Sequence, residues 1–443
     1  MTNNQVETQL VVVNNPIQQP NRLAGNVSFF DSNGNSLPFP SNLDAKYVSV
    51  NQPPLNPYLY GFDPSAIGSV NRTSFTNDIN ALGSSGGHIQ IRMPGTYLIS
   101  GGSIAIPSNV TISGTGPNTV IKNDVGSSTP VFVNADTVNG NTNIIFRDFS
   151  IDGNNTNRLA ASSYNVVTMN NLSYCNFSNL TVSNGAYGAS LGTGCGLSFS
   201  RMTRSVIQNV TVIGNEYDGV ILGGSTFNHI SKLVGVNNGR NTILLTRYPI
   251  GSGTTPSQFN TISQVSHEHS TGTPTTGVPT TGVVYTHMSN YNMFNNVVAY
   301  GTRMGIGGGE SSIGNIFTNL TLQTRWVDRA AICFEQVNST SNQRWKISGV
   351  TIRPLSGAGG LIAKFENAVF NSIRDVTFYV GGGSGSWGIN LDNSSVDNEI
   401  SGFADVGGIA PTVTDTGSRN SIGYILGGSL KVLKSGGTVV SLT

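Results

Sequence analysis

Two glutamates, Glu310 and Glu335, each follow a short apolar segment of the same pattern, and their spacing fits paired-carboxylate catalysis. If the segments are strands of stacked coils, residues at equivalent positions on adjacent coils lie roughly 5 Å apart. Carboxyl groups at about that separation can cleave a glycosidic bond with retention, and a larger separation favours inversion. Superimposing the segments gives a strip of polar residues at the strand ends: Arg247, His287, Glu310, Gln336 and, one position off, Glu335, continued by Glu366 and Asp392. The alternative is that these strand ends are exposed turns with solvated charges.

The tripeptide His267-Glu268-His269 is a second candidate, because it begins the largest insertion in the repeat. His267 occupies a position that is apolar in the corresponding segments, and a polar interruption of a repeat indicates function. Hydrogen bonding to a sugar or acid and base catalysis would suit these side chains. Zinc binding would also suit them, but the spacing matches no metal pattern and neighbouring strand residues point to opposite faces. We expect no metal or other cofactor, and a loop with incidental histidines is the alternative.

Three further residues could hold a sugar chain. Arg303 and Arg329 fall at corresponding positions and could bind a carboxylated sugar, or Arg329 could form an ordinary ion pair with Asp328. Trp326 offers a flat face for stacking on a sugar ring. Tyr285 offers one too, but its apolar segment places it on the inward side, which favours a core role.

The elements that must position these residues repeat along the chain. The tripeptide Asn-x-[Ile/Phe] recurs every 22 to 32 residues, with Trp345-Lys-Ile347 in one vacant slot; its asparagines are Asn228, Asn260, Asn292, Asn315, Asn371, Asn398 and Asn420. That period is one coil of a solenoid. We expect the asparagines to stack at one inward corner, where each amide can hydrogen-bond to its neighbours.

Two short apolar phrases accompany each repeat. One has the form [Asn/Gly/Asp]-[Val/Leu]-Thr-apolar, as in Asn179-Leu-Thr-Val182, and begins with a residue type that tolerates positive φ. The other is a second strand with alternate inward residues, such as Val220 and Leu222, or Val283 and Tyr285. Short strands without helical periodicity in a Gly/Asn/Ser/Thr background predict an all-β fold, a parallel β-helix of about ten to thirteen coils. The preference of parallel crossovers makes it right-handed.

Composition excludes several classes of partner. Charged residues are 10% of the 443 residues and the net charge is +1, so no basic field for nucleic acid is expected. The sequence shows no secretory signal and no apolar run that could insert into a membrane. The three cysteines are an odd number at wide spacing, which favours buried thiols over a disulfide framework.

Three regions differ in texture. Residues 1–62 contain a hairpin signal at Asn33-Gly34 and then an extended linker. Residues 63–425 form the solenoid. They begin with a short predicted helix that starts at Thr73 or Ser74, runs through Phe75, Ile79 and Leu82, and covers the end of the solenoid before the repeats. Residues 426–443 are a C-terminal cap or a trimer contact.

The segment from the helix through Gly86-Gly87, Pro94-Gly-Thr-Tyr97 and Ser108-Asn-Val-Thr-Ile112 resembles the start of the pectate-lyase-like β-helix of viral tailspikes and related polysaccharide-degrading enzymes. The resemblance covers about residues 70–425. It implies that Asp218-Gly219 matches an Asp-Gly step of this superfamily, where the aspartate is catalytic or bonds the turn. The paired aspartates and Gly-His-Gly element of polygalacturonases are missing, so their residue roles do not transfer.

The resemblance implies a viral tailspike or receptor-binding protein on the virion surface, acting outside the cell as a homotrimer. Its partners would be a host-surface polysaccharide, which it recognises and could depolymerise, and other tail proteins held through residues 1–62. The superfamily includes hydrolases, lyases and non-catalytic adhesins, so activity is left open. The alternatives are a purely adhesive or structural virion protein and a free-standing polysaccharide lyase or glycosidase.

Overall fold

The computed structural model describes residues 29–30, 36–37, 54–188, 192–250, 252–269, 282–324, 330–335, 342–353, 360–379, 387–405, 412–426, 429–435 and 438–441. The chain divides into a unit of residues 1–55 and a unit of residues 56–443. In the first unit, β1 (Phe29–Phe30) pairs antiparallel with β2 (Ser36–Leu37), which confirms the hairpin, although its turn lies outside the described residues. The second unit begins at Asn56, and within it Phe62 packs against the rings of Phe75 and Tyr97.

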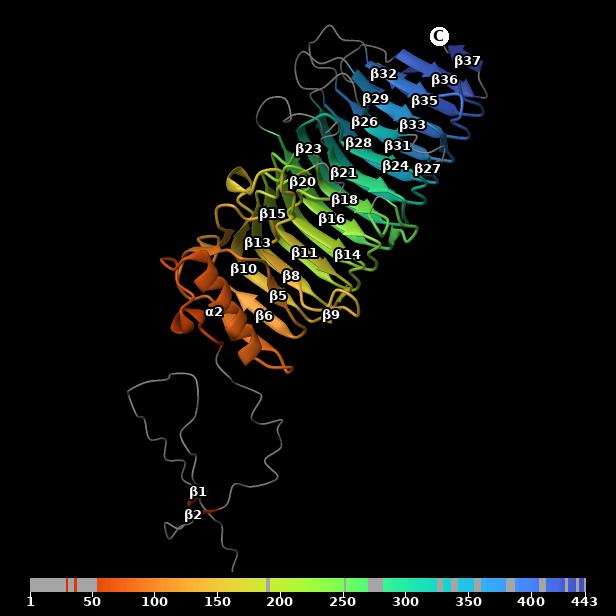
Figure 1. Cartoon of the computed structure of the whole chain (residues 1–443). Coiled ribbons are helices and arrows are strands. Elements are labelled where there is room, and N and C mark those ends of the chain that lie inside the picture. The colour runs from red at the N-terminus through yellow and green to blue at the C-terminus, as the bar shows by residue number, and fades with distance from the viewer. Residues whose placement is uncertain are drawn as a thin grey trace, which may run out of the picture. The chain divides into compact units, whose positions relative to one another are not determined.

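The second unit is a right-handed parallel β-helix whose coils stack along one axis, as Figure 1 shows. Each coil adds one strand to each of two long sheets, called sheet 1 and sheet 2 here. The twelve described strands of sheet 2 agree with the predicted ten to thirteen coils. Sheet 2 consists of β5 (Ile104–Ile106), β8 (Phe132–Asn134), β11 (Val167–Asn170), β14 (Leu197–Ser200), β16 (Val220–Gly223), β18 (Asn241–Thr246), β21 (Gly282–His287), β24 (Ile306–Gly309), β26 (Ala330–Glu335), β29 (Gly360–Phe365), β32 (Trp387–Leu391) and β34 (Thr412–Asp415).

Sheet 1 holds most of the longer strands and is parallel except at its C-terminal end, where β36 and β37 are antiparallel additions. Its strands are β3 (Gly87–Gln90), β4 (Gly95–Ile99), β6 (Val110–Ser113), β7 (Thr119–Asn123), β10 (Ile145–Asp152), β13 (Asn176–Ser183), β15 (Val206–Ile213), β17 (His229–Val236), β20 (Thr261–Glu268), β23 (Met293–Thr302), β25 (Ile316–Thr324), β28 (Lys346–Ile352), β31 (Ser372–Phe378), β33 (Glu399–Asp405), β35 (Ser421–Leu426), β36 (Ser429–Ser435) and β37 (Thr438–Ser441). Short pairs join the sheets at one corner: β9 (Asn141–Thr142) with β12 (Leu172–Ser173), β19 (Ser257–Gln258) with β22 (Ser289–Asn290), and β27 (Asn342–Gln343) with β30 (Ala368–Val369).

The predicted asparagine ladder is confirmed. The amide of Asn260 donates to Oδ1 of Asn292 at 2.9 Å, and its own Oδ1 accepts from the backbone N–H and the amide of Asn228. The pattern continues through the buried asparagines Asn315, Asn371, Asn398 and Asn420. Trp345 fills the vacant slot, where its backbone N–H donates to Asn371 and its ring N–H to the carbonyl of Ser312. Each buried amide therefore has partners on the neighbouring coils.

The turns before the sheet 1 phrases have the predicted backbone conformation. The first residue of each phrase has a φ between 52° and 65°; these residues are Asn179, Asn209, Asn319, Gly349 and Asp375. Asparagine, aspartate and glycine tolerate this region with little strain, which explains why the motif begins with them. The three cysteines are free and buried, as predicted.

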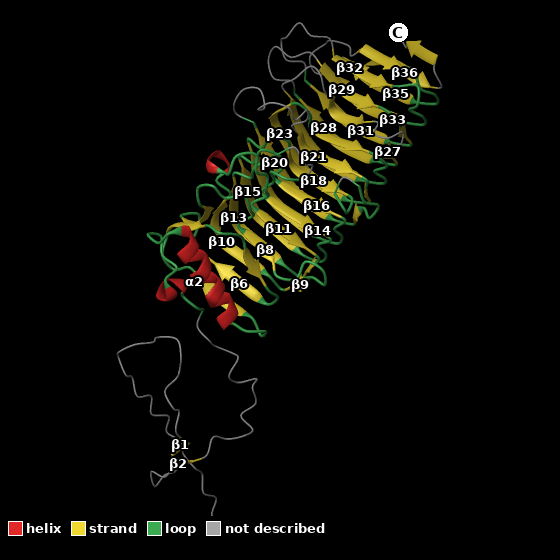
Figure 2. Cartoon of the chain, in the orientation of Figure 1, coloured by secondary structure: helices red, strands yellow, loops and turns green. Residues whose placement is uncertain are grey.

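A helix caps the N-terminal end of the β-helix, and Figure 2 shows that strands dominate the rest. Helix α2 (Gly68–Ala81) begins earlier than the predicted start at Thr73 or Ser74. Packing overrides the capping preference there: Thr73 bonds back to the carbonyl of Ser69, and Ser74 is buried. Phe75 packs against Phe132 of the first coils, so the helix covers the core. The short 3₁₀ helices η1 (Pro57–Tyr60) and η2 (Asn155–Asn157) complete the helical content that is described. In the described part of the chain, no helix has the length and hydropathy to cross a membrane.

Candidate functional site

The outer face of sheet 2 carries a second buried cluster, distinct from the core between the sheets. A side-chain carbon added at Gly308 would meet the ring of Trp345 in the core, whereas one at Gly307 would meet Met304 and Tyr285. Residues level with Gly307 therefore point outward. The cluster consists of Cys195, Tyr217, Ile221, Leu244, Tyr285, Met304, Ala330 and Cys333, with Tyr187, Ile250 and Leu361 packed against it. The outer face of sheet 2 therefore carries an apolar cluster of its own.

Tyr285 belongs to this outer face, which corrects its predicted inward position. The strand hydrogen bonds pair Ile243 with Val284, so the inward residues of β21 are Val284 and Thr286. The sequence alignment was one residue off because both faces of β21 are apolar and buried. The Tyr285 hydroxyl donates to Oε2 of Glu335 at 2.8 Å.

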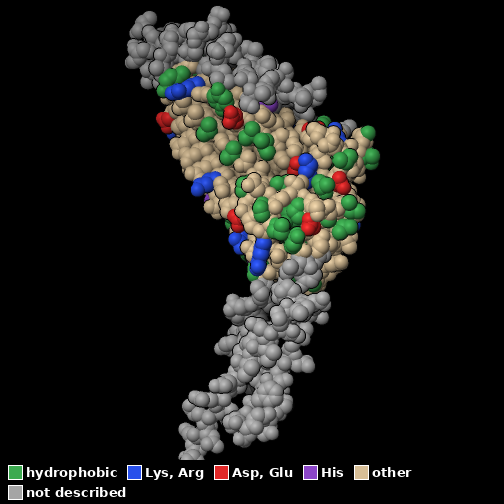
Figure 3. Space-filling view, turned by 90° about the vertical axis from the view of Figure 1, so that its left-hand side faces the viewer, with side chains coloured by type: hydrophobic (Ala, Val, Ile, Leu, Met, Phe, Trp, Pro, Cys, Tyr) green, Lys and Arg blue, Asp and Glu red, His purple; other side chains and the backbone are tan. Residues whose placement is uncertain are grey.

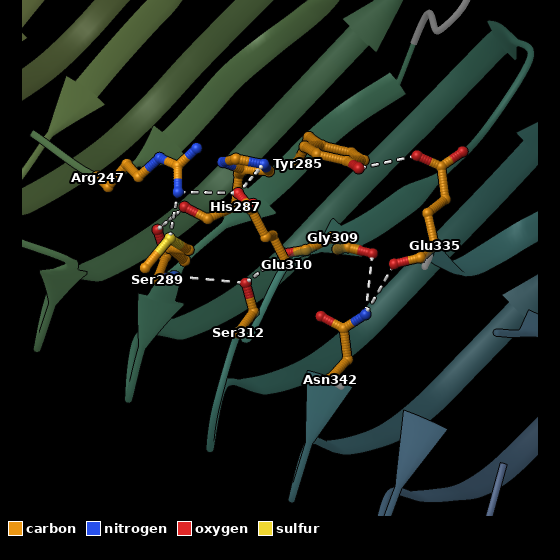
Figure 4. A network of polar contacts seen from close by, with 11 residues as sticks. Arg247, Tyr285, His287, Ser289, Gly309, Glu310, Ser312, Glu335 and Asn342 are labelled. Atoms are coloured by element: carbon orange, nitrogen blue, oxygen red, sulfur yellow. Dashed lines mark hydrogen bonds and ion pairs between the residues drawn. The ribbon is translucent and has the colours of Figure 1, made fainter. Parts of the chain in front are cut away.

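The structure brings Arg247, His287 and Glu310 together, as the strip predicts (Figure 4). Oε2 of Glu310 lies 2.7 Å from Nε2 of His287 and 3.2 Å from a guanidinium nitrogen of Arg247. The Glu310 side chain is only 5% exposed, against 20% for His287. Burial lowers the pKa of His287; Arg247 and Arg240 lower it further, and Glu310 opposes them. At neutral pH the imidazole is therefore neutral.

Glu335 lies level with Gly309, one position before Glu310. Its carboxylate is directed to Tyr285, whereas the Glu310 carboxylate is directed to His287 and Arg247 (Figure 4). Both glutamates are thus engaged with neighbours and do not face each other as a free pair. This arrangement differs from the two carboxyl groups that flank a glycosidic bond in hydrolases.

Asp218 is fully buried at the start of β16. Its Oδ1 accepts from the backbone N–H and the amide of Asn241 at 3.0 and 2.8 Å. Burial raises the pKa of Asp218, and the nearby Arg240 opposes that shift. These bonds to the next coil give the aspartate a structural role in the turn.

Arg240 and Tyr217 belong to the site but were missed in the sequence. The guanidinium of Arg240 lies 4.8 Å from the ring centre of Tyr217 and 5.6 Å from that of Tyr285, and it donates to the Tyr217 hydroxyl. Tyr217 immediately precedes Asp218 and Arg240 immediately precedes Asn241, and these two residues are hydrogen-bonded between neighbouring coils. Their equivalent positions on two successive coils could have indicated a contact between them. The sequence comparison considered only residues at the ends of the strands.

A pocket of about 100 Å³ opens between these groups. It is lined by Gly192, Tyr217, Arg240, Leu244, Thr246, Ile250 and His287. Its lining of apolar side chains, aromatic rings and a few directed polar groups resembles that of small-molecule sites, although its volume is below their usual range of about 300–1,000 Å³.

His267 and His269 are not at this pocket. His267 lies on the inward row of β20 between Gly235 and Ala299 of the neighbouring coils, and its Nδ1 is 2.8 Å from the Thr242 hydroxyl. Burial lowers the pKa of His267 to about 3, so it is a neutral core residue. The small neighbours explain how the core accepts a polar ring at this slot. Glu268 is exposed on the other face of sheet 1.

The remaining predicted residues are dispersed. Arg303 is partly buried just after β23, and Trp326, Arg329 and Gln336 lie outside the described residues. Glu366 pairs with Lys364 at 2.5 Å, while Asp392 accepts from the backbone of Asn367 and so stabilises a turn. Among the described residues, no group of three or more His, Cys, Asp and Glu side chains could hold a metal ion.

Solved structures show what this architecture is similar to. The N-terminal fragment of bacteriophage phi29 gene product 12 superimposes with a TM-score of 0.56 and 16% identity, over 88% of this chain and 73% of that one. The Dettilon tailspike protein gives 0.54 and 15%, over 80% and 66%. A Yersinia enterocolitica family 28 exopolygalacturonase gives 0.53 and 13%, over 88% and 82%. No family model matches the chain, and no curated protein matches its sequence. The chain thus shares the right-handed parallel β-helix fold with these phage proteins and this exopolygalacturonase.

Proposed function

We propose that this chain is a phage tail spike protein that binds a host-surface polysaccharide through the outer face of sheet 2 and depolymerises it. The observation that carries the proposal is the pocket beside Tyr217, Arg240 and His287. Rings and apolar groups can contact the faces of a sugar, and the arginine and imidazole can bond its polar groups. A virion location is supported by the bacteriophage proteins, one of them a tailspike, among the structures of the same fold.

The surface of the rod is consistent with a carbohydrate partner. Figure 3 shows one face on which Lys, Arg, Asp and Glu side chains are few and scattered among hydrophobic side chains and other groups. Such a surface offers hydrogen bonds to a neutral or weakly charged polymer without a strong field of either sign. An extended sugar chain could then lie along several coils, with one unit in the pocket.

Filling the pocket should weaken recognition of the polysaccharide. We expect Thr246→Tyr to weaken binding of the host polysaccharide by about tenfold or more, because Thr246 lines the pocket and a tyrosine would occupy it. Binding is measured by calorimetry, and cleavage by new chain ends. Thr261→Tyr, on the exposed side of β20, is the matched control and should bind as the wild type does. Equal binding by both variants would move the site elsewhere, and binding without cleavage by the wild type would favour the adhesive alternative.

Assembly as a homotrimer belongs to the same proposal. Phe227, Phe259 and Tyr291 form an exposed stack, with successive ring centres 5.3 and 5.6 Å apart, on turn residues whose φ is 56° to 58°. Bulky residues rarely adopt this conformation. The turn itself therefore does not explain why these three positions are aromatic, and a contact of the rings with a partner would. A row that repeats with the coils is matched best by another copy of the same rod.

We expect light scattering to give the mass of three chains, with the aromatic stacks along the contact. Phe259→Asn should weaken that association and leave the fold intact, because asparagine tolerates the same φ. A wild-type mass of one chain would contradict the proposal. In the proposed assembly, residues 1–55 attach the trimer to other tail proteins.

A further inference from the structure

The outer face of sheet 1 carries a group of polar side chains around Ser113, called the Ser113 cluster here. Gln90 and Arg147 are paired with Ser113 across β3, β6 and β10, so the three residues lie side by side in one row. The preceding residues on two of these strands, Ile112 and Phe146, are buried in the core. Because successive strand residues alternate between faces, the row points outward. It lies on a different sheet from the pocket.

Two more side chains reach this row from β3 and from the turn after it. Nε2 of His88 lies 2.7 Å from the Ser113 hydroxyl. Nε of Arg92 donates to Oε1 of Gln90 at 3.3 Å. Ser113 is buried although its strand position faces outward, so its neighbours cover it. The cluster therefore gathers two guanidinium groups and an imidazole around one hydroxyl.

The charges around His88 are mainly positive. Burial lowers the pKa of His88, and the guanidinium groups of Arg147 and Arg92 lower it further, so the ring is neutral at neutral pH. The adjacent strand β6 (Val110–Ser113) contributes no charged side chain. Asp148 supplies one carboxylate: its Oδ2 lies 3.2 Å from Arg147, and its Oδ1 accepts from the amide of Asn179. Within the described cluster, one carboxylate thus stands against two cations.

Both arginines retain donors for a ligand. A guanidinium has five N–H donors in one plane. In the described part of the chain, Arg92 uses its Nε and Arg147 uses one terminal nitrogen. The Arg147 side chain is 46% exposed, so its remaining donors can be reached from solvent. Guanidinium groups of this kind bind oxyanions through paired, charge-assisted hydrogen bonds.

We infer that the Ser113 cluster binds a tetrahedral oxyanion, a sulfate or phosphate group, through Arg92, Arg147 and His88. The inference does not depend on the proposed function, because it concerns another face of the molecule. The anion accepts hydrogen bonds from the two arginines and offsets the repulsion between their charges. His88 adds a ring N–H, and it gains a proton more readily once an anion lies beside it.

The test uses the full chain and sulfate, whose charge stays constant over the pH range, whereas phosphate titrates near neutrality. We expect calorimetry to show saturable binding and nuclear magnetic resonance to show a raised pKa of His88. Sodium chloride at the same ionic strength should produce neither effect. Arg147→Gln and Arg92→Gln should each weaken sulfate binding about tenfold or more. Arg374→Gln is the matched control, because Arg374 is another exposed arginine of sheet 1, paired with Glu399, and it should bind as the wild type does.

The pH dependence separates a ligand contact of His88 from a structural role. Sulfate binding should tighten as pH falls through the pKa of His88, because the protonated ring adds a charge and a donor. His88→Gln keeps a polar group near Ser113 but cannot gain a proton, so it should bind sulfate without this pH dependence.

Sulfate binding of equal strength in the wild type and both arginine variants would overturn the inference, as would an equal effect of sodium chloride. Arg92 lies at an exposed position, so its variant keeps the test valid should Arg147→Gln disturb the strand. Glucose 6-sulfate distinguishes the two sources of the group. Tighter binding of this ester than of sulfate supports a group carried on a sugar, and equal or weaker binding supports a free ion.

Discussion

Replacing Asn260 with alanine should lower the free energy of unfolding by about 3–5 kcal/mol. Asn260 takes part in four bonds of the ladder: its amide donates to Asn292 and to the carbonyl of Ser225, and its Oδ1 accepts two bonds from Asn228. All three asparagines are buried, so water cannot replace the lost partners. Each buried group left unsatisfied costs about 1–3 kcal/mol, and some of the affected groups retain a second partner.

Denaturant unfolding followed by circular dichroism measures this effect. Asn295→Ala is the matched control, because Asn295 lies on the exposed side of β23 and bonds only to the exposed side of the next coil. It should cost less than about 1 kcal/mol. A similar loss in both variants would show that the buried ladder has no special contribution.

The ladder could be predicted because the repeat fixes both its spacing and its chemistry. An asparagine that recurs before an apolar residue on successive coils has few ways to satisfy its amide other than its own copies above and below. Trp345 replaces an asparagine in this ladder. Its backbone N–H still donates to Asn371, and its ring fills the space of the missing amide and packs against Phe317.

The site was predicted less completely because register errors move a residue to the opposite face. The β21 segment is apolar at every position from Val283 to Tyr285, so periodicity could not select between two alignments one residue apart. Strand pairing selects one and turns Tyr285 outward. The prediction of a functional role for His267 rested on a polar residue at a position that is apolar in the other repeats. In the structure His267 lies in the core, where the small neighbour Gly235 and the contact with the Thr242 hydroxyl accommodate its ring.

Arg240 shows the limit of searching for paired carboxylates. The residue precedes its strand and its partner Tyr217 lies a coil away, so neither neighbour in sequence suggests the contact. Only the stacking of two coils places the guanidinium against the ring and beside Asp218.

Glu310→Gln should weaken binding of the host polysaccharide about tenfold or more, because Glu310 contacts His287, which lines the pocket. A glutamine can still approach Nε2, but it carries no charge. The pKa of His287 distinguishes this positioning role from a purely structural one. Burial keeps that pKa below its usual value of 6.5, and Glu310 opposes the shift. Removing the carboxylate should therefore move the titration of His287 to still lower pH, which nuclear magnetic resonance measures.

Glu399→Gln provides the matched control, since Glu399 forms a largely exposed ion pair with Arg374 on sheet 1. It should retain both the binding of the polysaccharide and the titration of His287, because a surface pair of this kind contributes little. Thermal unfolding of both variants checks that the Glu310 substitution has not simply melted the coil. An unchanged titration of His287 with weakened binding would assign Glu310 to packing alone, and unchanged binding in Glu310→Gln would show that recognition does not depend on this carboxylate.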